Sequence, residues 1–440
     1  MSTKKDILLL GATGYSGRLT AAYLLKHPAR STFSLQLAGR SKAKLDALAA
    51  QLRADSLSLD GVEFVLIDVT NDSQLERAVK DARVVINTVG PFWLWGTPVV
   101  RACARNGVHY VDINGEWPWV HKIIQEYDFL ATKTGAVIVP CCGFDSVPGD
   151  VSAYVSVRTL QAHNPALTAG DSTTAYNVKG GVSGGTVSTA ITFMESIPRW
   201  RMSQSSRPYA LSPVIGKRAA WPRFLYSFPP SLSSIQGGYW VMRGINTAIV
   251  RRTWGLFYTN SLRNSSQASE PSTKPYGPEF LYDEFMQTAS VFHSFATSFM
   301  LFSTMVLMMF APVRWIAKRV VPSAGSGPPP EVLEQRWAKI TNITSSAPSP
   351  GQRQTHVQTI FKGRGDPGYL LTAIFLGEAA LTLLPPSFDG LTSLAKRGGV
   401  LTPMSALGEG YIERLKRSGR IEIDSKVITE RASASAKKTQ

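Results

Sequence analysis

Cysteine is scarce in this chain, and three thiols among 440 residues cannot build a disulfide framework. They are Cys103, Cys141 and Cys142, of which the last two are sequence neighbours and therefore poorly placed to pair with each other. No cysteines and histidines occur at metal-ligand spacing, so we expect no metal site. Thiols without a disulfide pattern favour a reducing, intracellular compartment.

A secretory leader is also missing from the sequence. The first apolar run, residues 7–10, has four residues, whereas a signal-peptide core needs about 7–15. A run this short is typical of a buried strand. We therefore expect no signal peptide.

Acidic residues are absent between positions 196 and 269, although the whole chain carries a net charge of +16. The basic residues in this interval are Arg199, Arg201, Arg207, Lys217, Arg218, Arg223, Arg243, Arg251, Arg252 and Arg263, interleaved with Trp200, Trp221, Tyr239, Trp240 and Trp254. Such a surface suits an acidic partner, either a membrane headgroup layer or an acidic carrier protein, while a solvated basic face is the structural alternative. No nucleic-acid recognition motif accompanies the charge, so we expect no nucleic-acid partner.

The length exceeds the limit of about 250–300 residues for one hydrophobic core, which predicts two domains. Residues 1–150 alternate apolar runs with helical patterns and predict an N-terminal Rossmann-type doubly wound parallel sheet in an α/β protein. The expected strands are 7–10, 33–38, 62–67, 84–88, 109–112 and 136–140, and the expected helices are 17–26, 43–53, 72–80, 97–106 and 118–134.

The sequence GATGYSG at 11–17 follows the first apolar run and opens a helix, as a phosphate-binding turn requires. Its glycines allow a tight turn and a close approach of backbone to pyrophosphate, and the helix N-terminus supplies N–H groups. The residues expected to bind the cofactor here are Gly11, Thr13, Gly14, Tyr15, Ser16 and Gly17.

The end of the second strand indicates which dinucleotide binds. An NAD site normally has a carboxylate there, but this strand is followed by Arg40, Ser41 and Lys44, which attract a 2′-phosphate. We therefore predict NADP(H).

Polar residues also follow the later strands, and such strand ends border the cofactor in this fold. Asp68 could bond the adenine or instead cap the helix beginning near residue 72. The other expected cofactor contacts are Asn87, Gly90 and Pro91, and the candidate proton donors are Asp145, Ser146, Tyr110 and Cys142, among which the sequence does not choose. No tyrosine is followed four residues later by lysine, so the carbonyl-reducing mechanism of short-chain dehydrogenases is not supported.

Residues 151–430 are expected to form a second, substrate-binding α/β or α+β domain with a basic, irregular region at 196–275, and residues 431–440 a disordered tail. This domain carries a hydrophobic insert at 285–313, which has no charged residue. That segment could span a membrane, lie on it as an interfacial helix or hairpin, or form a buried core helix.

Several motifs together resemble the saccharopine dehydrogenase-like oxidoreductases, the group that includes trans-acting enoyl reductases. They are GATGYSG (11–17), AGRS (38–41), NTVGPFWLWGTPVV (87–100), ACARNGVHYVDINGE (102–116), CCGFDSVPGD (141–150), SGGT (183–186), GSGPP (325–329), GDPGY (365–369) and GGVLTP (398–403). The resemblance implies NADP(H) and a second domain over the first. It also implies that the C-terminal part packs back on the first domain, and that the protein is associated with a membrane or lipid droplet, with the cytoplasm as the alternative.

The expected activity is hydride transfer from NADPH to a C=C or C=N bond of a hydrophobic polyketide- or lipid-derived substrate. One alternative is a non-catalytic NADP(H)-binding scaffold on a membrane or lipid droplet. Another is an amino-acid dehydrogenase of the saccharopine type that acts on an imine. The oligomeric state stays open.

Overall fold

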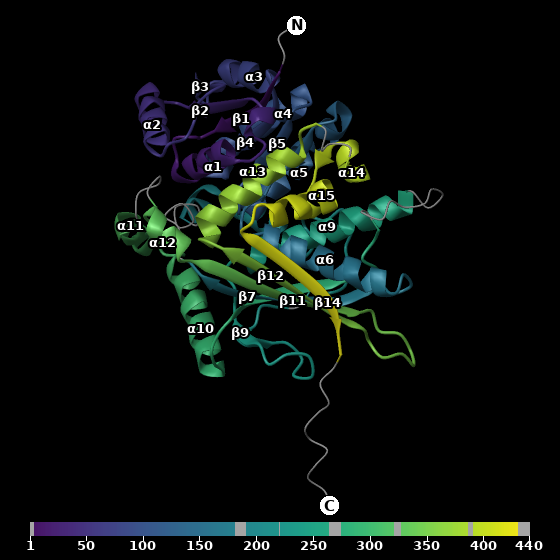
Figure 1. The fold of residues 1–440 in the computed structure, drawn as a ribbon. Helices are drawn as coiled ribbons and strands as arrows, with labels where there is room; N and C mark the ends of the chain where they lie inside the picture. Colours follow the sequence, from purple (N-terminus) through teal and green to yellow (C-terminus); the bar gives the residue numbers. More distant parts are fainter. Residues whose placement is uncertain are drawn as a thin grey trace, which may run out of the picture.

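The computed structural model describes residues 4–180, 191–219, 221–263, 274–320, 327–385 and 390–429. Two seven-stranded sheets form the framework, and the helices α13 and α15 lie between them (Figure 1). The expected tail at 431–440, the SGGT motif at 183–186 and residues 325–326 of the GSGPP motif lie outside the described residues.

The first sheet confirms the predicted Rossmann-type fold. Its strands are all parallel and follow the order β13-β6-β5-β4-β1-β2-β3, so the connections reverse direction between β1 and β4. Its elements are β1 (Lys5–Leu10), α1 (Tyr15–Lys26), η1 (Arg30–Thr32), β2 (Leu35–Gly39), α2 (Lys42–Ala54), β3 (Val62–Leu66), α3 (Asp72–Lys80), β4 (Ala82–Asn87), α4 (Phe92–Asn106), β5 (His109–Asp112), α5 (Trp117–Thr134), β6 (Val137–Val139) and β13 (Gly399–Val400).

Two features of this sheet differ from the sequence-based expectation. Helix α4 begins at Phe92 rather than at residue 97, because the Glu116 carboxylate accepts hydrogen bonds from the N–H groups of Phe92 (2.8 Å) and Trp93 (2.7 Å). Glu116 is distant in the sequence, but its side chain satisfies the N–H groups that a local N-cap residue would otherwise satisfy. The sequence near residue 92 therefore has no capping residue that would indicate the start of the helix. The seventh strand, β13, has only two residues and gives no periodic signal.

The second sheet has the order β14-β12-β11-β7-β10-β9-β8, in which only β7 and β10 run parallel. Its elements are α6 (Val147–His163), β7 (Ala169–Lys179), α8 (Arg199–Ser205), β8 (Tyr226–Ser227), β9 (Gln236–Gly238), α9 (Arg243–Arg263), β10 (Leu281–Gln287), α10 (Val291–Leu307), α11 (Ala311–Val320), α12 (Pro330–Glu334), β11 (Trp337–Ser346), β12 (His356–Arg364), η3 (Pro367–Leu371), α13 (Thr372–Thr382), α14 (Ser393–Lys396), α15 (Pro403–Arg417) and β14 (Ile421–Ile428). The domain boundary expected at residue 150 falls within α6, and it stays a prediction.

The basic region at 196–275, expected to be irregular or loosely helical, has no helix or strand among the described residues of 206–225, but it also contains the long helix α9. Helix α9 runs for 21 residues and buries most of them. Arg243, Arg251 and Arg252 are at most 8% exposed. Arg243 pairs with Asp283 (2.6 Å), and Arg252 donates to two backbone carbonyls, so these cations stabilise the interior and do not contribute to a basic surface.

The apolar segment at 285–313 divides between β10, α10 and the start of α11. Among the described residues, no single helix is long and apolar enough to cross a membrane, and α10 meets α11 at a bend of 109°. Together α10 and residues 311–317 form a bent pair that has the length and composition for a span, so the spanning and interfacial alternatives both stay predictions. The alternative of a buried core helix is wrong, because Ser294 and Ser298 are the only buried residues of α10.

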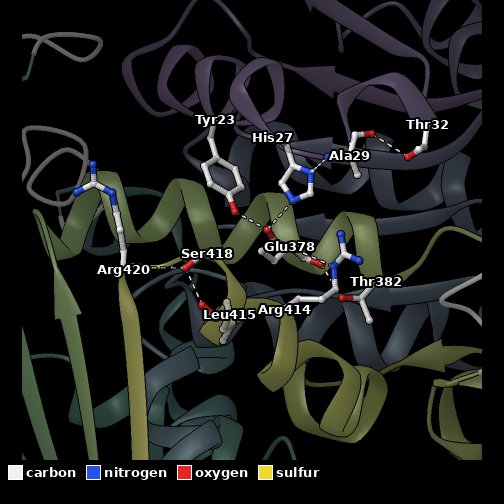
Figure 2. A network of polar contacts seen from close by, with 10 residues as sticks. All are labelled: Tyr23, His27, Ala29, Thr32, Glu378, Thr382, Arg414, Leu415, Ser418 and Arg420. Atoms are coloured by element: carbon white, nitrogen blue, oxygen red, sulfur yellow. Dashed lines mark hydrogen bonds and ion pairs between the residues drawn. The ribbon is translucent and has the colours of Figure 1, made fainter.

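Helix α13 joins the two sheets, and all its residues are buried. Glu378, the charged residue of α13, contacts residues of both α1 and α15 (Figure 2). The Tyr23 hydroxyl donates to Glu378, and Arg414 Nε donates to its Oε2 at 2.8 Å. His27 Nδ1 accepts the Ala29 N–H, which leaves Nε2 to donate to Glu378 Oε1 at 3.0 Å.

We expect Glu378→Gln to lower the free energy of unfolding by about 3 kcal/mol, because it leaves Arg414 without its buried counter-ion. Burial alone would raise the pKa of Glu378, but the His27 hydrogen bond, the Arg414 charge and the Tyr23 hydrogen bond outweigh it and hold that pKa below 4.5. The charged form therefore stabilises the fold above pH 4.5, and this contribution falls as the pH drops below that value. Urea unfolding from pH 7 to pH 3 measures the difference.

The matched control is Glu413→Gln on the exposed side of α15, where the side chain pairs with Arg417 at i,i+4. This change should cost less than about 0.5 kcal/mol. Equal losses for the two variants at pH 7 would contradict the role given to Glu378.

Candidate active site

The glycine turn has the geometry of a phosphate cradle. Gly11 has a φ of +80°, and a Cβ there would lie 2.7 Å from Thr88 Oγ1. A Cβ at Gly17 would lie 2.1 Å from the Gly11 carbonyl oxygen, so strand and helix approach too closely for any side chain. Gly14 precedes α1 and offers no side-chain cap, which leaves the first-turn N–H groups, including those of Tyr15 and Ser16, for a ligand. The turn therefore fits a dinucleotide.

The Tyr15 side chain leaves this turn toward the second sheet. Its ring lies 4.6 Å from that of Tyr369 between centroids, and its hydroxyl donates to the Pro328 carbonyl. A Cβ at Gly327 would lie 2.3 Å from the Tyr15 ring, so these faces are in close contact. Any cofactor contact of Tyr15 would come from its backbone.

Basic side chains lie at the end of β2 beside the glycine turn. The Thr13 side chain packs against Gly39, the last residue of β2, and Arg40 follows as an exposed side chain. Ser41 caps α2 by accepting the Lys44 N–H at 3.4 Å, and the Lys44 side chain is exposed. This is a cationic helix start with no carboxylate at the strand end, as a 2′-phosphate requires.

Asp68 does not cap α3, contrary to one of the two expectations. The N-cap is Asn71, whose Oδ1 accepts the Gln74 N–H. Asp68 Oδ1 instead accepts the N–H (2.9 Å) and the hydroxyl (2.7 Å) of Thr70, and these bonds lower the pKa of the carboxyl. Its contact with adenine stays a prediction.

Alternate polar residues after β5 hold the neighbouring loops in place. Asp112 Oδ1 accepts the N–H groups of Asn114 (2.9 Å) and Cys141 (2.8 Å), and Asn114 Oδ1 accepts the Glu116 N–H at 2.6 Å. Glu116 in turn caps α4. These roles could not be assigned from the sequence, although the alternating pattern D-x-N-x-E lies inside the motif at 102–116.

Two of the four candidate proton donors lie inside this network. The Tyr110 side chain is fully buried, donates to Asp112 Oδ2 at 2.8 Å and accepts from Asn87 Nδ2 at 3.1 Å. Cys142 is fully buried and donates to the Val139 carbonyl at 3.4 Å, and burial raises its pKa well above the usual range. Neither group presents an accessible proton, whereas Asn87 fixes the loop toward Gly90 by accepting the Val89 N–H.

Asp145 occupies a different setting at the end of β6. Its side chain is partly exposed, and no described residue bonds its carboxylate. A Cβ at Gly115 would lie 3.4 Å from Asp145 Oδ2 and 3.7 Å from Met242 Cε, so the carboxylate and an apolar side chain both lie close to Gly115 in the loop after β5. Although the residue keeps some exposure to solvent, the protein around its carboxyl group desolvates it and raises the pKa of Asp145 to about 6. A carboxyl group with this pKa can hold and release a proton near neutral pH.

Side chains from the second sheet lie beneath Ser146. Ser146 Oγ donates to Asn246 Oδ1 at 3.4 Å, and Asn246 Nδ2 donates to Glu284 Oε1 at 2.8 Å. The Tyr282 hydroxyl donates to Glu284 Oε2 at 2.9 Å, and burial raises the pKa of Glu284 to about 8. Sequence reasoning missed this cluster because its members come from α6, α9 and β10 and share no motif.

A dinucleotide cradle and a proton-bearing carboxyl group on one sheet edge define a nicotinamide-dependent oxidoreductase. The family model of the saccharopine dehydrogenase NADP-binding domain matches residues 7–139. A Mycobacterium tuberculosis protein provisionally named a trans-acting enoyl reductase is 32% identical, over 94% of this chain and 96% of its own. The Mycobacterium leprae trans-acting enoyl reductase is 30% identical over the same shares.

The chain therefore belongs to the saccharopine dehydrogenase-like oxidoreductases that include the trans-acting enoyl reductases, and it is an NADP(H)-dependent oxidoreductase. The apo saccharopine dehydrogenase of Saccharomyces cerevisiae is a distant structural neighbour, with 11% identity and a TM-score of 0.48 over 97% of this chain and all of that one. A likeness at this level carries no inference on function.

We expect Arg40→Asp to weaken NADPH binding by about 1.5–3 kcal/mol, because it replaces a charge-assisted contact to the 2′-phosphate by repulsion. NADH binding should not weaken. Fluorescence titration with both nucleotides measures this, and the control is Arg53→Asp in the exposed last turn of α2, the helix that follows Arg40. Unchanged NADPH affinity in the Arg40 variant would refute the assigned phosphate site.

Proposed function

We propose that this chain transfers hydride from NADPH to a C=C bond of a hydrophobic, polyketide- or lipid-derived acyl substrate, and that Asp145 supplies the proton. The observation that carries the proposal is the Asp145 carboxylate, which lies beside Met242 at the sheet edge where Rossmann folds bind their ligands. The name enoyl reductase of the relatives supports C=C over C=N.

The chain's own residues divide the work between binding and proton delivery. The glycine turn and Arg40 hold the dinucleotide, which supplies the hydride when bound. Reduction of the double bond forms two C–H bonds, one from the hydride and one from a proton. Asp145 gives that proton, is left as a carboxylate and is reprotonated from water. The Asp112, Asn114 and Glu116 bonds keep the flanking loops in position.

The two alternatives make different predictions. A non-catalytic scaffold would bind NADPH without turnover, which disagrees with the assignment to an oxidoreductase family. An imine-forming amino-acid dehydrogenase would consume NADPH with soluble amino and keto acids instead of an enoyl thioester.

A trans-acting enzyme receives its substrate from another protein, and the charge around α8 suits an acidic carrier. Arg199 and Arg207 are exposed there, and the Arg201 side chain lies over the Trp200 ring. Trp117 Nε1 donates to Ser206 Oγ at 3.4 Å, which ties this helix to α5 beside the Glu116 loop. We infer that an enoyl group on an acidic carrier protein is the better substrate than the free thioester.

We expect Asp145→Asn to lower the single-turnover rate of enoyl thioester reduction by about 10²–10⁴-fold, the contribution of a positioned general acid. Because the donor must be protonated and its pKa is about 6, the wild-type rate should be level below pH 6 and fall above it. The variant should lose this pH dependence while NADPH affinity is kept. Loss of NADPH absorbance and mass spectrometry of the product measure both.

The matched control is Ser146→Ala at the neighbouring position, where the hydroxyl bonds to Asn246 and should not deliver the proton. This variant should keep most of the rate and the wild-type pH profile. The proposal fails if Asp145→Asn turns over normally, or if the Ser146 variant alone loses the pH dependence.

A further inference from the structure

Helix α10 packs on the protein through small polar residues. Its buried residues are Ser294 and Ser298. Ser298 Oγ accepts the Tyr239 N–H at 2.8 Å and donates to the Phe224 carbonyl at 2.7 Å. A Cβ at Gly238 would lie 2.6 Å from the Ser294 carbonyl oxygen, so β9 and α10 approach closely. The helix is therefore held firmly by its polar side.

Most of the large apolar residues of α10 are exposed, although Phe302 packs on Phe224 and Tyr239. Phe292, Phe295 and Phe299 are 77%, 51% and 58% exposed, and their spacing places them on one face. The other exposed apolar residues of α10 and the following turn are Val291, Met300, Met305, Val306, Leu307, Met309 and Phe310. A helix on a water-facing surface has the opposite polarity, and an exposed apolar patch of this extent marks an interaction site.

The neighbouring elements add aromatic and basic side chains to this patch. On α11, Trp315 is 56% exposed and the Arg319 guanidinium lies 3.4 Å from the centre of its ring. In the loop 221–225, Trp221 is 78% exposed, and the Phe224 ring lies 5.5 Å from that of Phe295. Arg223 follows Trp221 by two positions, and its side chain is 61% exposed. Tryptophan and arginine beside an apolar face are typical of a membrane interface with anionic lipids.

We propose that α10, α11 and the loop 221–225 dock onto an anionic phospholipid membrane, with both helices lying in its interface. Charge complementarity selects the occupant. Asp283 is shared by Arg243 (2.6 Å) and Arg223 (3.7 Å), and Glu195 faces Arg314 at 3.5 Å, so the described basic side chains at this surface outnumber the acidic ones. The bend of 109° between the helices fits an arrangement in which both lie in the membrane surface better than one in which they cross the membrane. Figure 1 shows α10 at the outer edge of the second sheet, away from α13 and α15.

The same surface connects with the candidate active site through residues 239–242. The Tyr239 ring lies 4.7 Å from Phe302 of α10, and Trp240 stacks on Tyr176 at 5.3 Å. Met242 then reaches the Gly115 position beside Asp145. If the substrate is hydrophobic, which rests on the proposed function, this stretch lies between the membrane and the reacting groups.

The test is sedimentation of the full-length protein with phosphatidylcholine vesicles, with and without phosphatidylglycerol. The wild type should bind the anionic vesicles, and binding should weaken at high salt. The triple variant F292S/F295S/F299S should lose at least about tenfold in vesicle affinity, because it removes the apolar contact. The control Phe129→Ser removes an aromatic side chain that is 75% exposed on α5, and it should bind as the wild type does.

NADPH affinity and thermal unfolding should be the same in all three proteins, which shows that the surface change leaves the fold intact. Vesicle binding needs no turnover, so its outcome is independent of the proposed reaction. Equal vesicle binding by the triple variant and the wild type overturns the proposal, as does equal binding to neutral and anionic vesicles. A wild-type dimer that the triple variant makes monomeric, without vesicle binding, would show that a second copy covers the face.

Discussion

A carboxylate in the middle of a fully buried helix is the constraint on which the arrangement of the two sheets depends. Glu378 lies on α13, and its charge is tolerable only because Tyr23 and His27 on α1 and Arg414 on α15 converge on it. Three segments far apart in the sequence must therefore assemble together. This assembly also positions α13 relative to the candidate site. The hydroxyl of Thr372 on α13 accepts the Phe144 N–H at 3.1 Å, and Phe144 directly precedes Asp145.

The candidate site depends on a related principle, in which buried carboxyl groups accept hydrogen bonds from neighbouring segments. Asp112 and Glu116 are both at most 1% exposed, and each carboxylate accepts N–H groups from a loop that borders the cofactor edge. Asp150 repeats the pattern, with Thr253 donating to one oxygen and the Met404 N–H to the other. Because these carboxyl groups hold the loops, Asp145 makes no structural hydrogen bond among the described contacts. A partly exposed carboxyl group without a bonding partner is available for chemistry.

Structural features that local periodicity encodes can be predicted from the sequence. Features that depend on contacts between residues distant in the sequence cannot. The glycine turn and six parallel strands follow from alternation and spacing, and the structure confirms them. The two-residue β13 has no period, and the start of α4 is set by Glu116 from another loop. The arginines of α9 looked like a surface because composition does not reveal Asp283, which pairs with Arg243. The sequence also could not indicate which of the four candidate proton donors lies at the cofactor edge of the sheet, because Tyr110 and Asp145 differ only in their tertiary neighbours.

The structure departs from ordinary burial rules in two ways, and the described chain compensates for only one of them. Buried arginines and carboxylates violate the rule that charge stays outside, but partners within the chain compensate each of those described above. Helix α10 violates the rule that apolar side chains stay inside, and within the described chain its phenylalanine face stays uncovered. Folding gains nothing from that exposure, because the helix is held by Ser294 and Ser298 on its other side. A feature that costs solubility without aiding the fold points to a function, which agrees with the proposed docking of α10 on a membrane.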